Sequence, residues 1–396
     1  MANTLLTPTA VTREALRILH QKCNFIGNIN RQYDDSFAKS GAKIGDSLKI
    51  RLPNQYSVRT GKTLDVQDTA ESSVTLQVAT QKGVDVNFSS ADLTLSLDDF
   101  SERILQPAMS VLAANIEADA LSMYKDVYQQ VNNVGSAATF AGVANVRKKL
   151  IDALTPQDDL NMLINTEDNV DLVDALKGLF HDSKEVAKQY REGYIGRTSG
   201  FSFMENTLLP VHTTGTENGA STTLTVNGAD QTGAAVTVAN GSSKTLKQGD
   251  IVTFAGCNRV HPETKVDTGQ LMQFVVTADV GTSGTSIAIS PSIVTSGAKQ
   301  NVSASPTDSG AVTKVGGASA AHNISMGFHR DAFAFATADL VMPKGVDFAA
   351  RQVLDGISMR IVRAYDINND AMPCRLDVLY GHKAIRPELA CRWANN

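Results

Sequence analysis

One stretch, residues 97–131, constrains the fold most because its apolar residues follow the period of a helix. They recur at three- and four-residue steps, as Ile104, Ala108, Val111, Leu112, Ile116, Ala120, Met123, Tyr124 and Val127. Pro107 lacks an amide hydrogen, so we expect a short helix up to Gln106 and a long second helix with Pro107 in its first turn. The second helix would be roughly 35 Å long at about 1.5 Å per residue. Glu117 and Asp119 lie off its apolar face, which predicts that they point toward water or a neighbouring subunit.

Size and charge narrow the classes of protein to consider. At 396 residues the chain is too long for one typical core, so we expect two or three domains. Its net charge of −5 argues against a strongly basic nucleic-acid-binding protein, but not against one that encloses nucleic acid without gripping it. No run approaches the roughly 20 apolar residues that cross a bilayer, and the N-terminus lacks the pattern of a secretory signal. The 4 scattered cysteines predict reduced thiols in a cytoplasm.

Residues 41–90 alternate apolar and polar side chains in the manner of half-buried strands. Three such runs occur, at residues 48–52, 74–78 and 84–88. Between the first two runs, residues 57–73 are polar and have little to bury. Two strands joined by a long polar tip predict an extended hairpin that needs a partner surface, because an isolated hairpin is marginally stable. A meander within an ordinary sheet is the alternative.

The second half of the chain changes character twice. Residues 140–211 alternate helical and strand patterns, which predicts a compact α/β domain. Residues 212–321 are rich in Gly, Ser and Thr and contain two Asn-Gly turn signals among short β-type runs, so we expect an inserted all-β domain, either a small barrel or a sandwich. Residues 322–396 return to longer strands, including an antiparallel pair near the C-terminus. One domain is therefore interrupted by another.

No catalytic constellation stands out in the sequence. His261-Pro262-Glu263 matches half of a zinc deaminase signature, but the paired cysteines that complete it are missing. His322 and His329 are seven residues apart in a strand-like segment, so they would point to opposite faces. We therefore expect no catalytic residues, no cofactor and no metal site. An enzyme with an unrecognised site in the α/β part stays an alternative, because active sites combine residues that are distant in sequence.

The order of these segments resembles the Hong Kong 97-type capsid fold of the major capsid proteins of tailed bacteriophages. The similar segments are ERILQPAMSVLAANIEADALSMY at 102–124, REGYIGRTSGF at 191–201 and CRLDVLYGHKAIRPELACRW at 374–393. In addition, residues 247–278 are similar to the insertion domain of P22-type phage coat proteins. The fold class that the resemblance implies is α+β: a Hong Kong 97-like capsid fold with an N-arm, an extended β-arm, a spine helix and an α/β axial domain, plus an inserted all-β barrel domain.

The resemblance also implies a division of the chain. Its segments are the N-terminal arm at 1–40, the extended β-arm at 41–90, the spine helix of the peripheral domain at 91–139, the axial α/β domain at 140–211, the inserted all-β domain at 212–321, and the return to the axial domain and the peripheral strands at 322–396.

By the same resemblance, the chain self-assembles into hexamers and pentamers of the icosahedral shell of a tailed double-stranded DNA phage or prophage. The implied partners are further copies of the chain, a scaffolding protein, a portal and packaged DNA bound without sequence specificity, with no membrane. The implied location is the virion, after assembly in the host cytoplasm. A bacterial surface or adhesin-like protein and a non-capsid phage structural protein are the remaining alternatives.

Charged residues on the extended arm are the candidates for contacts between subunits. They are Arg51, Arg59, Lys62, Asp65 and Asp68. A solvated tip without such contacts is the alternative. Lys43 and Lys62 lie where some capsids form covalent cross-links, but no acceptor for such a bond is identifiable in the sequence.

Overall fold

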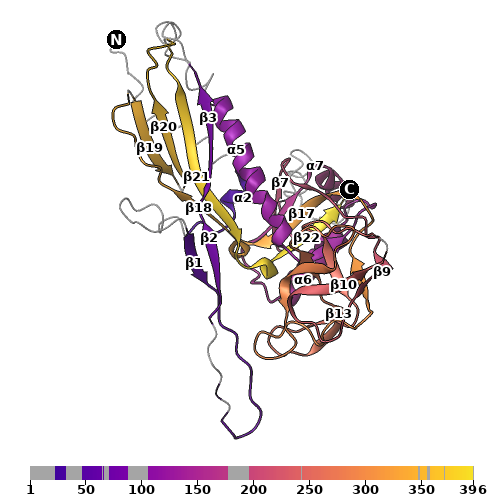
Figure 1. The fold of residues 1–396 in the computed structure, drawn as a ribbon. Helices are drawn as coiled ribbons and strands as arrows, with labels where there is room; N and C mark the ends of the chain where they lie inside the picture. The colour runs from indigo at the N-terminus through magenta and orange to yellow at the C-terminus, as the bar shows by residue number, and fades with distance from the viewer. Residues whose placement is uncertain are drawn as a thin grey trace. The chain divides into compact units, whose positions relative to one another are not determined.

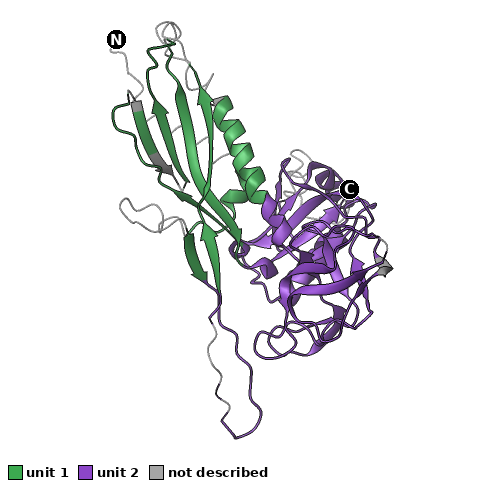
Figure 2. Ribbon diagram, in the orientation of Figure 1, with its two compact units in different colours: residues 1–50, 73–121, 333–385 green, residues 51–72, 122–332, 386–396 purple. Residues whose placement is uncertain are grey.

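The structure is a computed structural model of the 396-residue chain. It describes residues 23–32, 47–64, 66, 71–87, 106–176, 196–241, 243–346, 348–354, 357–369 and 371–395. The chain forms two compact units, shown in Figure 2. Unit 1 comprises residues 1–50, 73–121 and 333–385, and unit 2 comprises residues 51–72, 122–332 and 386–396. Most of the predicted N-terminal arm at 1–40, the predicted short helix before Gln106, and the candidates Asp65 and Asp68 lie outside the described residues.

Unit 1 is built on a five-stranded sheet with a helix, α5 (Gln106–Leu121), in the same unit (Figure 1). Its strands are β3 (Thr80–Val86), β18 (Phe333–Ala338), β19 (Phe348–Leu354), β20 (Ile357–Arg363) and β21 (Cys374–Ala384). The order is β18-β21-β20-β19, and β3 also pairs with β21. The predicted antiparallel pair near the C-terminus is therefore present as β20 and β21.

The helix α5 is shorter than the sequence pattern predicts. Pro107 is in its first turn, as expected, but the helix ends at Leu121. The chain then tightens into a 3-10 helix, η2 (Ser122–Asp126), and continues to the strand β4 (Gln130–Asn132). Leu121, Tyr124 and Val127 are all buried, and their three-residue spacing fits the three residues per turn of a 3-10 helix. The apolar pattern continued past the end of the α-helix for that reason.

Two predictions about the faces of α5 are wrong. Val111, assigned to the apolar face, is 58% exposed, whereas Glu117 is fully buried. One oxygen of Glu117 accepts a hydrogen bond of 2.8 Å from the backbone amide of Phe25 in a short helix, α2 (Asn24–Gly27). Asp119 is half-buried and accepts hydrogen bonds from Lys82 at 2.7 Å and from the hydroxyl of Tyr380 at 2.5 Å. Both carboxylates therefore tie α5 to other elements of unit 1.

Two further strands, β1 (Ser47–Arg51) and β2 (Ser73–Gln77), form a two-stranded sheet of their own. The third predicted strand, β3, instead joins the five-stranded sheet. The described residues between β1 and β2 form neither helix nor strand (Figure 1). This is the pairing that the extended hairpin predicts, rather than a simple meander.

Unit 2 contains a seven-stranded sheet in the order β4-β22-β17-β5-β7-β6, with β8 also paired to β17. Its other strands are β5 (Leu160–Ile164), β6 (Arg197–Thr198), β7 (Phe201–Glu205), β8 (Val211–Thr213), β17 (Ala321–His329) and β22 (Ala390–Asn395). Two helices, α6 (Phe140–Asp152) and α7 (Thr166–Leu176), supply the helical part of the alternating pattern. Thr139 caps α6 by accepting a 3.2 Å hydrogen bond from Gly142.

The glycine- and threonine-rich part of unit 2 folds into a closed six-stranded barrel, in the order β10-β15-β14-β11-β16-β9. The strands are β9 (Ala220–Val226), β10 (Gly233–Asn240), β11 (Ile251–Phe254), β14 (Phe274–Val276), β15 (Ser286–Ile293) and β16 (Ala311–Lys314). A small separate sheet pairs β12 (Asn258–Val260) with β13 (Asp267–Leu271). Of the two architectures that the sequence predicted for this segment, the structure contains the barrel and not the sandwich. The chain enters and leaves the barrel through β8 and β17, which pair with each other.

Candidate functional site

The seven-stranded sheet has one face packed on a helix and one face that carries buried polar groups. Gly327 and Trp393 lie on the helical face, close to Val146 and Gly142 of α6. His212 pairs with His322 across β8 and β17, and Arg392 pairs with Met326, four residues after His322. Because strand residues alternate between faces, these three basic side chains share the same face of the sheet.

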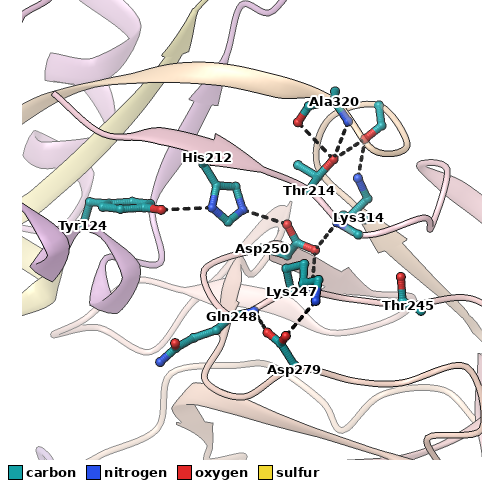
Figure 3. Close-up of polar contacts among 12 residues, drawn as sticks. Tyr124, His212, Thr214, Thr245, Lys247, Gln248, Asp250, Asp279, Lys314 and Ala320 are labelled. Carbon is teal, nitrogen blue, oxygen red and sulfur yellow. Dashed lines mark hydrogen bonds and ion pairs between the residues drawn. The ribbon is translucent and has the colours of Figure 1, made fainter.

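His212 lies between a tyrosine and a carboxylate on this polar face (Figure 3). Its Nδ1 is 3.1 Å from the hydroxyl of Tyr124 in η2, and its Nε2 is 2.9 Å from Oδ1 of Asp250 at the start of β11. Since an ionised carboxylate can only accept, Nε2–H donates to Asp250, and the Tyr124 hydroxyl lies within hydrogen-bond distance of Nδ1. One histidine therefore links a 3-10 helix, a strand of the sheet and a strand of the barrel.

Asp250 collects hydrogen bonds from three segments. In addition to His212, its Oδ2 accepts from the backbone amides of Gly215 at 3.0 Å and Lys247 at 2.8 Å. Burial opposes the ionisation of Asp250, but these hydrogen bonds outweigh burial and lower its pKa below the usual value. The nearby turn is closed by Asp279, which accepts from Lys247 Nζ and from the Gln248 amide, each at 2.8 Å.

Two basic groups beside this chain of hydrogen bonds, His322 and Arg392, are buried. The ring of His322 is 5.6 Å from that of His212. Burial, together with repulsion from His212 and Arg392, lowers the pKa of His322 to about 4. The guanidinium of Arg392 lies 5.8 Å from the ring centre of Tyr124, and burial lowers its pKa to about 10. The cluster joins the sheet to the barrel.

A second junction within unit 2 surrounds a pocket of about 270 Å³ between α6 and the barrel segment, meaning residues 212–321, which contain the barrel. The Gln273 side chain accepts a hydrogen bond from the Gln130 amide at 2.9 Å and donates to the Gln130 carbonyl at 3.1 Å, as a neighbouring strand would. Lys149 of α6 donates to the same Gln273 oxygen at 2.6 Å. Arg259 of β12 donates to the carbonyl of Asp152 at 2.5 Å, where α6 ends.

The predicted arm residues that the structure describes, Arg51, Arg59 and Lys62, are not gathered into one site. Arg51 forms a 3.4 Å ion pair with Glu71, which the sequence analysis did not select, and both side chains are exposed. Arg59 donates to the carbonyl of Gly61, and Lys62 is exposed. Asp65, Asp68 and Lys43 lie outside the described residues.

The histidines singled out in the sequence have local structural explanations. His261 Nδ1 accepts hydrogen bonds from the backbone amides of Glu263 and Thr264, each at 3.2 Å, so its ring closes a turn. His322 and His329 are both buried on β17. Within the described ranges, no group of three or more His, Cys, Asp or Glu could hold a metal ion, and no helix is long and apolar enough to cross a membrane.

Several solved structures resemble the chain. They include Mycobacterium phage Che8, with 14% identity over 92% of this chain and 89% of that chain and a TM-score of 0.49. The capsid of the cyanophage P-SCSP1u has 10% identity over 95% of this chain and 98% of that chain, with a TM-score of 0.43. The CUS-3 coat protein I-domain has 33% identity over 24% of this chain and 98% of that chain, with a TM-score of 0.20. No curated protein sequence matches the chain.

A family model of phage coat proteins matches most of the chain, so the chain is a major capsid protein. More specifically, the chain belongs to the P22 coat protein family, whose model, described as "P22 coat protein - gene protein 5", matches residues 13–392. This match confirms the family resemblance, the predicted fold class and the predicted role as a major capsid protein.

Proposed function

We propose that this coat protein closes an icosahedral shell of hexamers and pentamers around the double-stranded DNA of a tailed phage or prophage. One observation carries the proposal beyond family membership: the connection between β1 and β2 exposes apolar side chains that have no core of their own. Val58 is 95% exposed, Leu64 78% and Val66 77%. Burying such side chains against another copy is favourable, and it would supply the partner surface that a two-stranded hairpin lacks.

The charged candidates on the same hairpin fit this role. We propose that Arg51, Arg59, Lys62, Asp65 and Asp68 contact neighbouring subunits in the shell. The exposure of the Arg51–Glu71 pair and of Lys62 supports the idea, because these groups are accessible to a partner. The division into arm, hairpin, spine, axial and inserted segments at the predicted boundaries belongs to the same proposal.

Assembly would take place in the host cytoplasm around a scaffolding protein and a portal, before the shell becomes part of the virion. The net charge of −5 supports a wall that does not trap its DNA, since binding to the phosphate backbone requires an excess of Lys and Arg. The family is one of structural proteins, so the shell itself is the expected function.

The first test is negative-stain electron microscopy of the purified chain, alone and with its scaffolding protein. Closed shells, or rings of five and six copies, are the expected result. A folded monomer that never assembles in either condition would refute the proposal.

A pair of variants tests the hairpin directly. Val58→Asp places a charge on the exposed connection and should abolish shells while leaving a folded monomer. Val266→Asp is the matched control, since Val266 is 64% exposed on the barrel segment. Shells that form equally well from both variants would show that the hairpin does not make the contacts.

A further inference from the structure

The pocket between α6 and the barrel segment collects basic side chains from two elements. Lys148 and Lys149 come from the last turns of α6, and Arg259 comes from β12. Amide side chains complete the polar part of the wall, namely Gln129, Gln130, Asn132, Asn145, Gln270 and Gln273. One carboxylate, Asp152, also lines it. Three positive charges against one negative charge leave an excess of two positive charges.

None of these three basic groups has an ion-pair partner among the described residues. No carboxylate oxygen lies within 4.0 Å of Lys148, Lys149 or Arg259 among the described residues. Elsewhere in the described chain, six basic side chains that do form ion pairs are Lys82, Lys247, Arg351, Arg360, Arg375 and Arg386. The pocket therefore gathers three positive charges that no carboxylate contacts directly, in a chain whose net charge is −5.

Existing hydrogen bonds hold two of the three basic groups in place and leave them with donors to spare. Lys149 uses one donor on Gln273 and Arg259 uses one on the Asp152 carbonyl. A lysine has three N–H donors and an arginine has five. Burial, followed by the nearby charge of Arg259, lowers the pKa of Lys149, so the protonated lysine is held at a cost. An anion in the pocket would relieve that cost.

We propose that this pocket binds a phosphate group between α6 and the barrel. Inorganic phosphate carries between one and two negative charges near neutral pH and each backbone phosphate of DNA carries one, so the excess positive charge of the lining attracts either. Its oxygens also match the fork of an arginine and the point charge of a lysine. The group can come from free inorganic phosphate or from the backbone of DNA, and bound there it would fasten α6 to β12. This inference does not depend on how the shell assembles.

The test uses the full-length chain and inorganic phosphate as the probe, with chloride at matched ionic strength as the reference. Phosphate should raise the thermal midpoint by roughly 2 °C or more, because a ligand that binds only the folded state stabilises it. It should also broaden the phosphorus NMR line of free phosphate. Lys148→Gln should remove both effects, because it removes one of the three positive charges of the pocket. The variant should still fold, since no hydrogen bond in the described structure depends on this exposed side chain.

Two further variants make the result decisive. Arg259→Gln should weaken phosphate binding at least tenfold, while Lys299→Gln, an equal change of charge at an exposed position on the barrel segment, should leave it unchanged. An equal rise in all three variants would be a general effect of excluded salt and would overturn the proposal, as would no rise in the unmodified chain.

A short DNA duplex, added at the same phosphate concentration, then identifies the source. Tighter binding of the duplex that is lost in Lys148→Gln assigns the site to backbone phosphate. Binding of inorganic phosphate alone assigns it to the free ion.

Discussion

The barrel and the β1–β2 hairpin are both built from short strands, but they differ in how they bury their apolar side chains. The barrel closes on itself and buries a continuous apolar core that includes Val236, Phe254, Phe274 and Ile287. The hairpin is a two-stranded sheet with exposed apolar side chains on its connection. A closed barrel has no free edge and stabilises itself, whereas the exposed connection of the hairpin gains burial only from a partner. Self-sufficient and partner-dependent regions thus occur in one chain.

The largest expected effect lies in the barrel core. Phe254→Ala removes a fully buried ring that packs on Phe274 with 5.5 Å between ring centres. The loss of buried apolar area and the cavity that is left should lower the free energy of unfolding by about 3–5 kcal/mol. Chemical denaturation of the full chain, with proteolysis of the barrel as a second readout, measures it.

The hairpin supplies the control for that experiment. Tyr56→Ala, at a side chain 61% exposed, should change the free energy of unfolding by no more than about 0.5 kcal/mol. A comparable loss in the two variants would break the comparison, since the hairpin would then already be packed in the free chain.

A second effect lies at the base of the hairpin, where β2 crosses β21 within unit 1. A Cβ built on Gly381 would lie 1.9 Å from the carbonyl oxygen of Gln77, so only glycine permits this approach. Gly381→Ala should lower the free energy of unfolding by about 1–3 kcal/mol, because β2 must move away from the added methyl group. Gly281→Ala is the control, since a Cβ there meets nothing within 4 Å. Equal thermal midpoints of unfolding for the two variants would show that β2 is not held against the sheet.

The sequence predicted elements well where periodicity decides them. The strands at 47–51 and 73–77, α6 and the β-rich insertion follow from alternation, helical spacing and turn residues. It failed at α5, since the buried side chains of a 3-10 helix continue an α-helical pattern. It also placed Glu117 outside, because the partner that satisfies this carboxylate is 92 residues away.

The polar junction could not be read from the sequence for the same reason. Tyr124 and His212 are 88 residues apart, and His212 and Asp250 are 38 apart. They meet because β8 and β17 pair across the inserted barrel, and nothing local marks that register. The amide bridge of Gln273 to Gln130 likewise joins residues separated by 143 positions. Local rules predict elements, while tertiary pairing assembles the junctions.

We expect the junction that attaches the barrel to the seven-stranded sheet to weaken in acid. The pKa of His322 is about 4 in the folded chain, against a usual value of 6.5, so between these values the unfolded chain binds the extra proton. Stability therefore falls as the pH drops from 6.5 toward 4, by at most about 1.4 kcal/mol per pH unit. His212 and Arg392 oppose the charge on His322, and Asp250 favours it.

Removing the titrating group tests this assignment. His322→Phe should flatten the pH dependence of unfolding in that window, measured by denaturation at a series of pH values. An unchanged slope would assign the acid sensitivity to other groups.

The smallest expected effect on folding belongs to the hairpin and separates stability from assembly. Glu71→Gln removes the 3.4 Å ion pair with Arg51, whose side chains are 78% and 54% exposed. Solvent-exposed pairs of this kind contribute about 0–1 kcal/mol, so the unfolding midpoint should barely change. Shell formation should nevertheless become slower, or its dependence on salt should change. The reason is that Arg51, which has then lost its local partner, presents its charge to a neighbouring copy. Light scattering during assembly, compared with Lys247→Gln as an exposed pair on the barrel segment, measures the difference. Assembly unaffected by Glu71→Gln but altered by Lys247→Gln would reverse the roles assigned to the two regions.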